Sequence, residues 1–108
     1  MGNQAESKLS RKIMKALSLE GVFCFKVHGS SYMMAGLPDI IACVDGYFLG
    51  LETKMPAERN DVSSRQHRVH SMIAAAQGEV SVVCSVAEAI VIVRSIRAKK
   101  LESLGVSE

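Results

Sequence analysis

The dipeptide Asp45-Gly46 separates two short apolar runs, and no other feature limits the fold of this chain as strongly. An Asp-Gly pair in such a place favours a type I′ turn that joins two antiparallel strands into a hairpin. A two-residue loop pairs Val44 with Tyr47, so that every further cross-strand pair has residue numbers that sum to 91. The sequence therefore predicts that Asp39 lies opposite Glu52, at the end of the hairpin away from the turn.

Two carboxylates that face each other in this way define a candidate metal site. Side chains directly opposite each other on an antiparallel pair have Cβ atoms about 4.5 to 5.5 Å apart. Two carboxylates at that distance repel unless one is protonated or a cation lies between them. Carboxylate and carbonyl oxygens are ligands that suit Mg²⁺ or Mn²⁺. The opposed pair therefore predicts a divalent cation at this end of the hairpin.

The residues after Glu52 complete the candidate site. Because side chains alternate along a strand, Lys54 shares the face of Glu52, while Thr53 points the other way and offers only its backbone carbonyl. A lysine ammonium beside a metal ion can neutralise an anionic transition state at phosphorus. Metal-dependent cleavage of a phosphodiester is the reaction that this set of groups suits best.

The same spacing also fits a surface ladder of ion pairs. The flanking runs 40–44 and 47–51 are apolar at nearly every position, which is typical of interior strands buried on both faces. Charges at the ends of such strands are expensive to keep without partners or a function. The flanking sequence therefore favours the metal site over the ladder.

Composition predicts a single domain that spans residues 1–108. With 48% hydrophobic residues the chain can form one core, and it is small enough that pairing with a second copy would stabilise it. The odd number of cysteines and their apolar surroundings predict buried free thiols at Cys24, Cys43 and Cys84. The sequence has no segment like a signal peptide and no apolar run of membrane-spanning length, which predicts a soluble cytoplasmic protein.

Charge alone does not identify a nucleic-acid-binding protein. The formal net charge is +2, although basic residues cluster in the segments 8–15, 59–68 and 94–100. Each cluster fits a DNA-facing surface, and each fits the solvated face of a helix about as well.

Apolar periodicity and turn residues predict an α/β fold with the element order αβββαβα. The expected elements are a helix at 6–19, a strand at 22–27, the hairpin strands, a helix around 69–76 that ends at Gly78, a strand at 80–84 and a helix at 87–101. The segment 90–93 could instead be a strand, because β-branched residues dominate it. Ser85 and Glu88 have the spacing of a capping box, which favours a helix. That helix is apolar around most of its girth, and dimerisation is one way to bury it.

The chain resembles the VRR-NUC domain, the virus-type replication-repair nuclease group of the PD-(D/E)XK superfamily, over roughly residues 5–93. The resemblance rests on Glu6 in the first helix, Gly36-Leu37-Pro38-Asp39, Glu52-Thr53-Lys54, and Gln66 at the start of the next helix. It implies a restriction-endonuclease-like core with a mixed β-sheet flanked by helices, a site for Mg²⁺ or Mn²⁺, and hydrolysis of DNA. For small stand-alone viral or bacterial members it also implies homodimers that act on branched DNA such as Holliday junctions, in the cytoplasm of a bacterial or phage-infected cell.

The resemblance also assigns roles to individual residues. It makes Asp39 and Glu52 metal ligands, the Thr53 carbonyl a third ligand, and Lys54 the catalytic lysine. It places Glu6 toward the metal, commonly through water. Gln66 would lie near the lysine and the attacking water.

Two of these residues have a structural alternative. Asn3 and Glu6 have the spacing of a capping box, and so do Ser63 and Gln66. An acidic residue in a first helical turn is also favoured by the helix dipole. Glu6 and Gln66 could therefore be helix caps, site residues, or both.

The candidate DNA-contacting residues belong to the first strand, the loop after it and the start of the second helix. They are Lys26, His28, Ser30, Ser31, Tyr32 and Arg65. Loops beside a site are well placed to touch substrate. Lys26 could equally be a lysine that leaves the edge of the sheet.

The predicted function is a metal-dependent DNA endonuclease that is selective for branched DNA. The alternative is a catalytically weak module that holds DNA or a replication-repair partner. A restriction-type enzyme is disfavoured, because the sequence contains no recognisable base-reading insertion. Specificity would then depend on backbone shape and on the spacing of two sites in a dimer.

Overall fold

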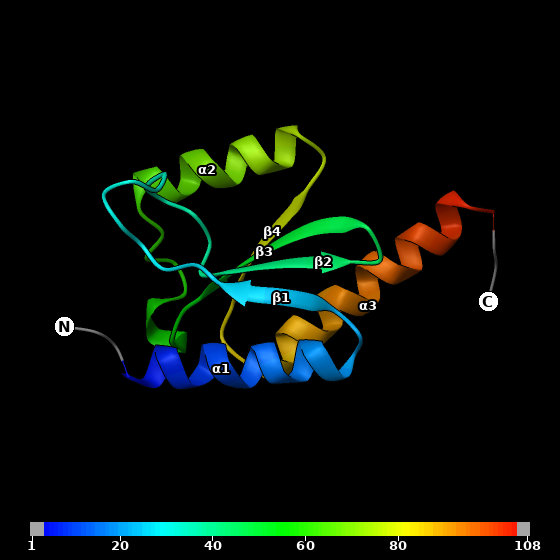
Figure 1. Cartoon of the computed structure of the whole chain (residues 1–108), viewed down its shortest axis with the longest axis horizontal. Helices are drawn as coiled ribbons and strands as arrows, with labels where there is room; N and C mark the ends of the chain where they lie inside the picture. The colour runs from blue at the N-terminus through cyan, green and yellow to red at the C-terminus, as the bar shows by residue number, and fades with distance from the viewer. Residues whose placement is uncertain (1–3, 106–108) are drawn as a thin grey trace.

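A mixed four-stranded sheet lies between α2 on one face and the pair α1 and α3 on the other (Figure 1). The computed structural model describes residues 4–105. The elements are α1 (Gln4–Leu19), β1 (Phe23–Lys26), β2 (Ile40–Val44), β3 (Tyr47–Thr53), the short 3₁₀ helix η1 (Pro56–Glu58), α2 (Ser64–Ala75), β4 (Glu79–Val83) and α3 (Val86–Ser103). The predicted order of helices and strands is confirmed, and η1 is an addition to it.

The hairpin has the predicted turn and register. Asp45 and Gly46 have φ values of 51° and 93°, the two positive values that a type I′ turn requires. The ladder runs from Val44 opposite Tyr47 to Ile40 opposite Leu51. In the sheet order β1-β2-β3-β4, β2 and β3 are the interior strands, and β4 runs parallel to β3.

The core lies between the sheet and the pair α1 and α3. Alternate residues of β2 and β3 point into it, and they are met by the apolar stripes of both helices. Its fully buried members are Ile13, Leu17, Ile40, Val44, Leu49, Leu51, Val83, Ala89 and Val93. The face of the sheet toward α1 and α3 is therefore the better covered one.

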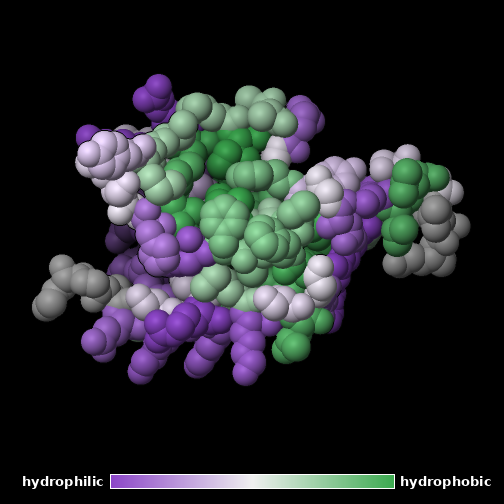
Figure 2. Space-filling model, viewed as in Figure 1, coloured by the Kyte–Doolittle hydropathy of each residue, from purple (hydrophilic) through white to green (hydrophobic). Residues whose placement is uncertain are grey.

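The opposite face of the sheet is covered only in part, because α2 packs mainly on β4. Phe23, Cys43 and Phe48 are directly paired across β1, β2 and β3, and all three are exposed on that face. Figure 2 shows apolar side chains gathered there, between α1 and α2. The prediction that the hairpin strands are buried on both faces is therefore wrong for β2 and for the start of β3, where Cys43 and Phe48 lie exposed.

The prediction of three buried thiols is wrong, and for Cys43 the reason is the open face of the sheet. Cys43 is exposed, while Cys24 and Cys84 are half-buried. The Cys24 thiol donates to the Met14 carbonyl at 3.7 Å. Burial raises the pKa of the Cys24 thiol.

The last segment is a helix, as the capping pattern predicted. The Ser85 hydroxyl accepts from the Glu88 backbone N–H at 3.1 Å, while the Glu88 carboxylate accepts from the Cys84 N–H at 3.2 Å. The helix is not buried all round, because Val91 is 65% exposed while Val93 is buried. The rest of the same chain therefore covers most of the apolar surface of α3.

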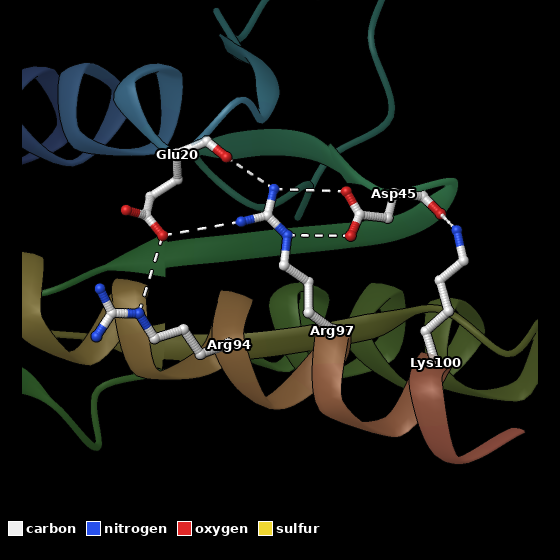
Figure 3. A network of polar contacts seen from close by, with 5 residues as sticks. All are labelled: Glu20, Asp45, Arg94, Arg97 and Lys100. Carbon is white, nitrogen blue, oxygen red and sulfur yellow. Dashed lines mark hydrogen bonds and ion pairs between the residues drawn. The ribbon is translucent and has the colours of Figure 1, made fainter. Parts of the chain in front are cut away.

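Arg97 of α3 ties together the end of α1 and the hairpin turn (Figure 3). Its guanidinium donates to the Glu20 carbonyl at 2.7 Å and to the Asp45 carboxylate at 3.0 Å. Arg94 lies 3.9 Å from the Glu20 carboxylate, and the Lys100 ammonium donates to the Asp45 carbonyl. These contacts fix the turn on α3 and so support the register of the hairpin. None of the helices within residues 4–105 combines the length and apolar character needed to cross a membrane.

Candidate active site

Glu52, near the end of β3, is a buried carboxylate with one unsatisfied oxygen. Its residue is 3% exposed, on the side of the sheet that α2 covers. Its Oε2 accepts a hydrogen bond from the Gln66 side-chain amide at 2.9 Å. Its Oε1 is buried and finds no hydrogen-bond partner among residues 4–105. A buried carboxylate oxygen without a donor is unfavourable unless a proton or a cation meets it.

Asp39 lies just before β2, where the sheet ends. Its Oδ2 accepts from both the backbone N–H and the hydroxyl of Thr53, each at 2.8 Å. The Lys26 ammonium lies 3.8 Å from its Oδ1. Because Asp39 is beyond the last ladder pair, its carboxyl group can contact Thr53 on the α1 side and also interact with Glu52 on the α2 side.

The side chain of Thr53 has a larger part than predicted. Its hydroxyl donates to Asp39, so it is free to accept the hydrogen bond from the Ser10 hydroxyl of α1 at 3.0 Å. Both Ser10 and Thr53 are almost fully buried. The prediction that Thr53 offers only its backbone carbonyl was wrong, because the carboxyl group of Asp39 reaches around the end of the sheet.

Sequence reasoning missed Ser10. Its position belongs to the buried stripe of α1 that continues with Ile13 and Leu17. A serine in an otherwise apolar stripe needs a hydrogen-bond partner when it is buried. That requirement is the signal that could have identified it.

The environment of Glu52 raises its pKa from 4.5 to about 8. Burial is the largest cause, followed by the charge of Asp39 and by the hydrogen bond that the two carboxyl groups can form only when one of them carries a proton. Lys54 acts in the opposite direction, and the charge of Glu6 adds a further increase. The pair therefore favours one proton, or an equivalent positive charge, between its two carboxyl groups.

Gln66 fills both of its alternative roles at once. Its Oε1 accepts from the Ser63 backbone N–H at 2.9 Å, and its own N–H donates to the Ser63 hydroxyl at 3.1 Å. These bonds form a complete capping box at the start of α2. The amide nitrogen of the same side chain remains available and donates to Glu52. The cap therefore fixes the direction from which Gln66 reaches the carboxylate.

Glycines let the segment before Asp39 pack closely on its neighbours. Gly36 has a φ of +90°, and a Cβ there would lie 2.4 Å from the Arg65 carbonyl oxygen in the first turn of α2. A Cβ on Gly50 would lie 2.7 Å from a ring carbon of Pro38. Only glycine fits either place without movement of the backbone or the ring. The segment is thus held between α2 and β3, and Asp39 with it.

The charges of Glu6 and Lys54 both affect the pKa of Glu52. Glu6 lies in the first turn of α1, and its negative charge raises that pKa. Asn3, its capping alternative, lies outside the described residues. The Lys54 backbone N–H donates to the Val83 carbonyl at 3.0 Å, which fixes the chain at the end of the parallel pair β3 and β4.

The remaining candidate DNA-contacting residues lie in several places around the site. His28, Ser30, Ser31 and Tyr32 are exposed, and Tyr32 is 98% exposed. Ser30 lines a hollow of about 340 Å³ that reaches Asp39. Arg65 is exposed on α2 and lines a separate hollow of about 180 Å³. Lys26 points to Asp39 rather than away from the sheet edge.

The residues of the site fit a hard divalent cation. Within residues 4–105, no three His, Cys, Asp or Glu side chains come together in a cluster that could hold a metal ion. A site made of Asp39 and Glu52 would need the Thr53 carbonyl and water for the rest of its ligands, a pattern that Mg²⁺ accepts. The unsatisfied Oε1 of Glu52 supports this assignment, because a cation would meet it.

Comparisons with known proteins agree on the fold. No family model matches the chain, and no curated protein sequence does. A solved structure described as a VRR-NUC domain matches with a TM-score of 0.63 and 17% identity, over 82% of this chain and 94% of that one. Hjc, a Holliday junction resolvase from the archaeal hyperthermophile Archaeoglobus fulgidus, matches with a TM-score of 0.53 and 21% identity, over 70% of this chain. The match spans 64% of the resolvase chain. At these identities the likeness shows the fold alone, and this chain has the restriction-endonuclease-like α/β fold of the two structures.

Proposed function

We propose that this chain is a Mg²⁺- or Mn²⁺-dependent endonuclease that hydrolyses phosphodiester bonds of DNA. The observation that carries the proposal is the buried Glu52 carboxylate, whose Oε1 has no hydrogen-bond partner within residues 4–105, while its neighbour Asp39 is held in place by Thr53. A protein gains nothing in stability from such a pair alone, because the two like charges repel. The pair is therefore better explained as a ligand set within a nuclease fold.

The metal ligands in this proposal are Asp39, Glu52 and the Thr53 carbonyl, with Glu6 acting through water. A bound Mg²⁺ or Mn²⁺ would polarise the phosphate and offset the negative charge that develops during hydrolysis. Thr53 and Lys26 hold the carboxylate of Asp39 from two directions.

Lys54 and Gln66 complete the catalytic set. The ammonium of Lys54 is close enough to affect the charge on Glu52, and it would neutralise an anionic phosphorus centre next to that carboxylate. Gln66, locked by its helix cap, would hold Glu52 in one orientation while the phosphate reacts.

Branched DNA, with the Holliday junction as its model, is the substrate that we propose, and a homodimer is the form that we expect to act on it. A symmetric dimer presents two sites to two strands, which suits symmetric cleavage of a four-way junction. The exposed Phe23 and Phe25, whose ring centroids are 6.1 Å apart, support self-association through the open face of the sheet, because exposed aromatic clusters of this kind commonly mark protein contacts. In this proposal the whole span 1–108 is one nuclease domain that works in the cytoplasm.

The test is cleavage of labelled four-way junction, flap and linear duplex DNA of matched sequence, with Mn²⁺ and with EDTA, alongside the mass in solution. The proposal expects metal-dependent cutting that is fastest on the junction, by a protein with twice the mass of one chain. Asp39→Asn and Lys54→Ala should each lower the rate by about 10²- to 10³-fold and keep DNA binding. Lys15→Ala, on the exposed side of α1, is the matched control and should cut like the wild type. Preference for linear duplex would reject the junction substrate.

The alternative is a catalytically weak module that holds DNA or a replication-repair partner. It predicts DNA binding without any metal-dependent product, for the wild type as well as for the variants. The acidic pair together with Lys54 favours the enzyme, since binding alone would not require a buried carboxylate.

A further inference from the structure

A basic pocket adjoins the candidate site on the side away from α2. It has a volume of about 300 Å³ and lies where α1 passes the end of β1. Its walls are Ser7, Ser10, Arg11, Met14, Lys26 and His28. Among these described lining residues none is acidic, while Arg11 and Lys26 are basic and His28 is a histidine.

Two wall residues connect the pocket to Asp39, Lys26 directly and Ser10 through Thr53. The Lys26 ammonium lies 3.8 Å from the Asp39 carboxylate. Ser10 bonds to the Thr53 hydroxyl, which in turn donates to Asp39. The pocket therefore adjoins the Asp39 side of the candidate site.

An anion of the size of a phosphate group suits this chemistry. An arginine guanidinium binds phosphate oxygens in pairs, and a lysine ammonium, a serine hydroxyl and an imidazole can each donate to the same group. In DNA, a second phosphate always lies one nucleotide away from the phosphate that reacts. A pocket that adjoins the reacting centre is therefore in the right place for the next phosphate along the strand.

We infer that this pocket binds a backbone phosphate of the DNA strand next to the one held at Asp39 and Glu52, with Arg11 and Ser7 as its outer contacts. The inference rests on the proposed nuclease function, which it extends by fixing where the strand runs. It places the strand across α1 and the end of β1, on the side of Asp39 opposite Gln66. Lys26 then serves two anions, the carboxylate and the phosphate.

The test compares two neighbouring charges on α1, with binding of a labelled four-way junction measured in EDTA at several salt concentrations. Arg11→Gln removes one of the two cationic side chains of the pocket, while Lys12→Gln removes an exposed charge of the same helix that does not line the pocket. Arg11→Gln should weaken binding about threefold to tenfold and lower the salt slope by about one. Lys12→Gln should change both much less, and Arg11→Lys should keep the slope.

A second pair of variants adds a phenyl ring without changing the charge, one in the pocket and one outside it. Ser7→Phe should weaken binding as Arg11→Gln does, while Ser95→Phe, at an exposed position of α3, should not. Equal effects of Arg11→Gln and Lys12→Gln, unchanged binding by Ser7→Phe, or no DNA binding by the wild type would each overturn the inference.

Binding in EDTA tests the pocket and cleavage in Mn²⁺ tests the nuclease function, so the two proposals can fail separately. A protein that cuts DNA but treats Arg11 and Lys12 alike would keep the nuclease function and lose the pocket. A protein that binds as predicted but never cuts would keep the pocket and lose the nuclease.

Discussion

The side-chain amide of Gln66 donates to the buried carboxylate of Glu52 at 2.9 Å, while its carbonyl oxygen caps the helix on which it lies. One side chain thus links the start of α2 to the end of β3. The cap limits the rotamers of Gln66, and the amide transmits that order to the carboxylate.

This double role can be separated by two substitutions. Gln66→Glu keeps an oxygen for the cap but replaces the donor with a second negative charge, so cleavage should fall by about 10²-fold with a smaller loss of stability. Ser63→Ala removes the partner of the cap and leaves the Glu52 contact, so it should cost about 1 kcal/mol of stability and keep most of the activity. Cleavage rates and urea unfolding measure the two effects. If the two variants lost stability and cleavage to the same extent, Gln66 would act as a helix cap alone.

The raised pKa of Glu52 predicts how the metal-free protein depends on pH. The carboxyl has a pKa of about 8 when folded and 4.5 when unfolded, so the folded state binds the proton more tightly. The contribution of Glu52 to stability is therefore fully present below pH 4.5, and this contribution is lost as the pH rises through 8. At 1.36 kcal/mol per pKa unit the loss is at most about 5 kcal/mol.

Glu52→Gln is the control for this dependence, because it removes the titrating group and keeps its size. In EDTA the variant should become more stable relative to the wild type as the pH rises from 5 to about 8. Added Mn²⁺ should restore the wild type and leave the variant unchanged. Chemical unfolding at four pH values is sufficient, and parallel curves for the two proteins would contradict the shifted pKa.

The chain of hydroxyls behind Asp39 predicts a non-additive pair of substitutions. Thr53→Val removes the donor to Asp39 and leaves the buried Ser10 hydroxyl without its acceptor, which should cost about 1 to 3 kcal/mol. Ser10→Ala should cost less, because Thr53 still donates to Asp39. The double variant should lose less than the sum of the two single losses. Ser95→Ala, at an exposed position, is the control, and strict additivity in urea unfolding would exclude the predicted coupling.

Gly36 should not tolerate a side chain. Gly36→Ala combines a positive φ with a Cβ placed 2.4 Å from the Arg65 carbonyl oxygen, so the segment that carries Asp39 must move. A stability loss of about 2 kcal/mol or more and a strong loss of cleavage are expected. Gly29→Ala is the matched control, because a Cβ at Gly29 meets no atom within 4 Å. Similar behaviour of the two variants would show that the close packing of Gly36 is unimportant.

The hairpin could be predicted from sequence because local chemistry decides it. The Asp45-Gly46 turn sets the register, and the register brings Asp39 and Glu52 to the same end of the sheet. The cap of α2 was equally readable, because Ser63 and Gln66 are three residues apart. Such features depend on neighbours in the chain.

Other features depend on how distant elements pack, and the sequence left them open. The exposure of Cys43 follows from the position of α2 over β4, which no local pattern encodes. The bond from Ser10 to Thr53 joins residues that are 43 positions apart. The sequence left open whether Lys26 points toward the site or away from the sheet edge, because this depends on the position of β1 beside Asp39.

The central claim is that Asp39 and Glu52 together capture a divalent cation. Its most direct test is the loss of the free Mn²⁺ signal in electron paramagnetic resonance when the protein is added at pH 8. The account predicts uptake by the wild type and little or none by Glu52→Gln. Equal uptake by both proteins, or none by the wild type, would contradict it.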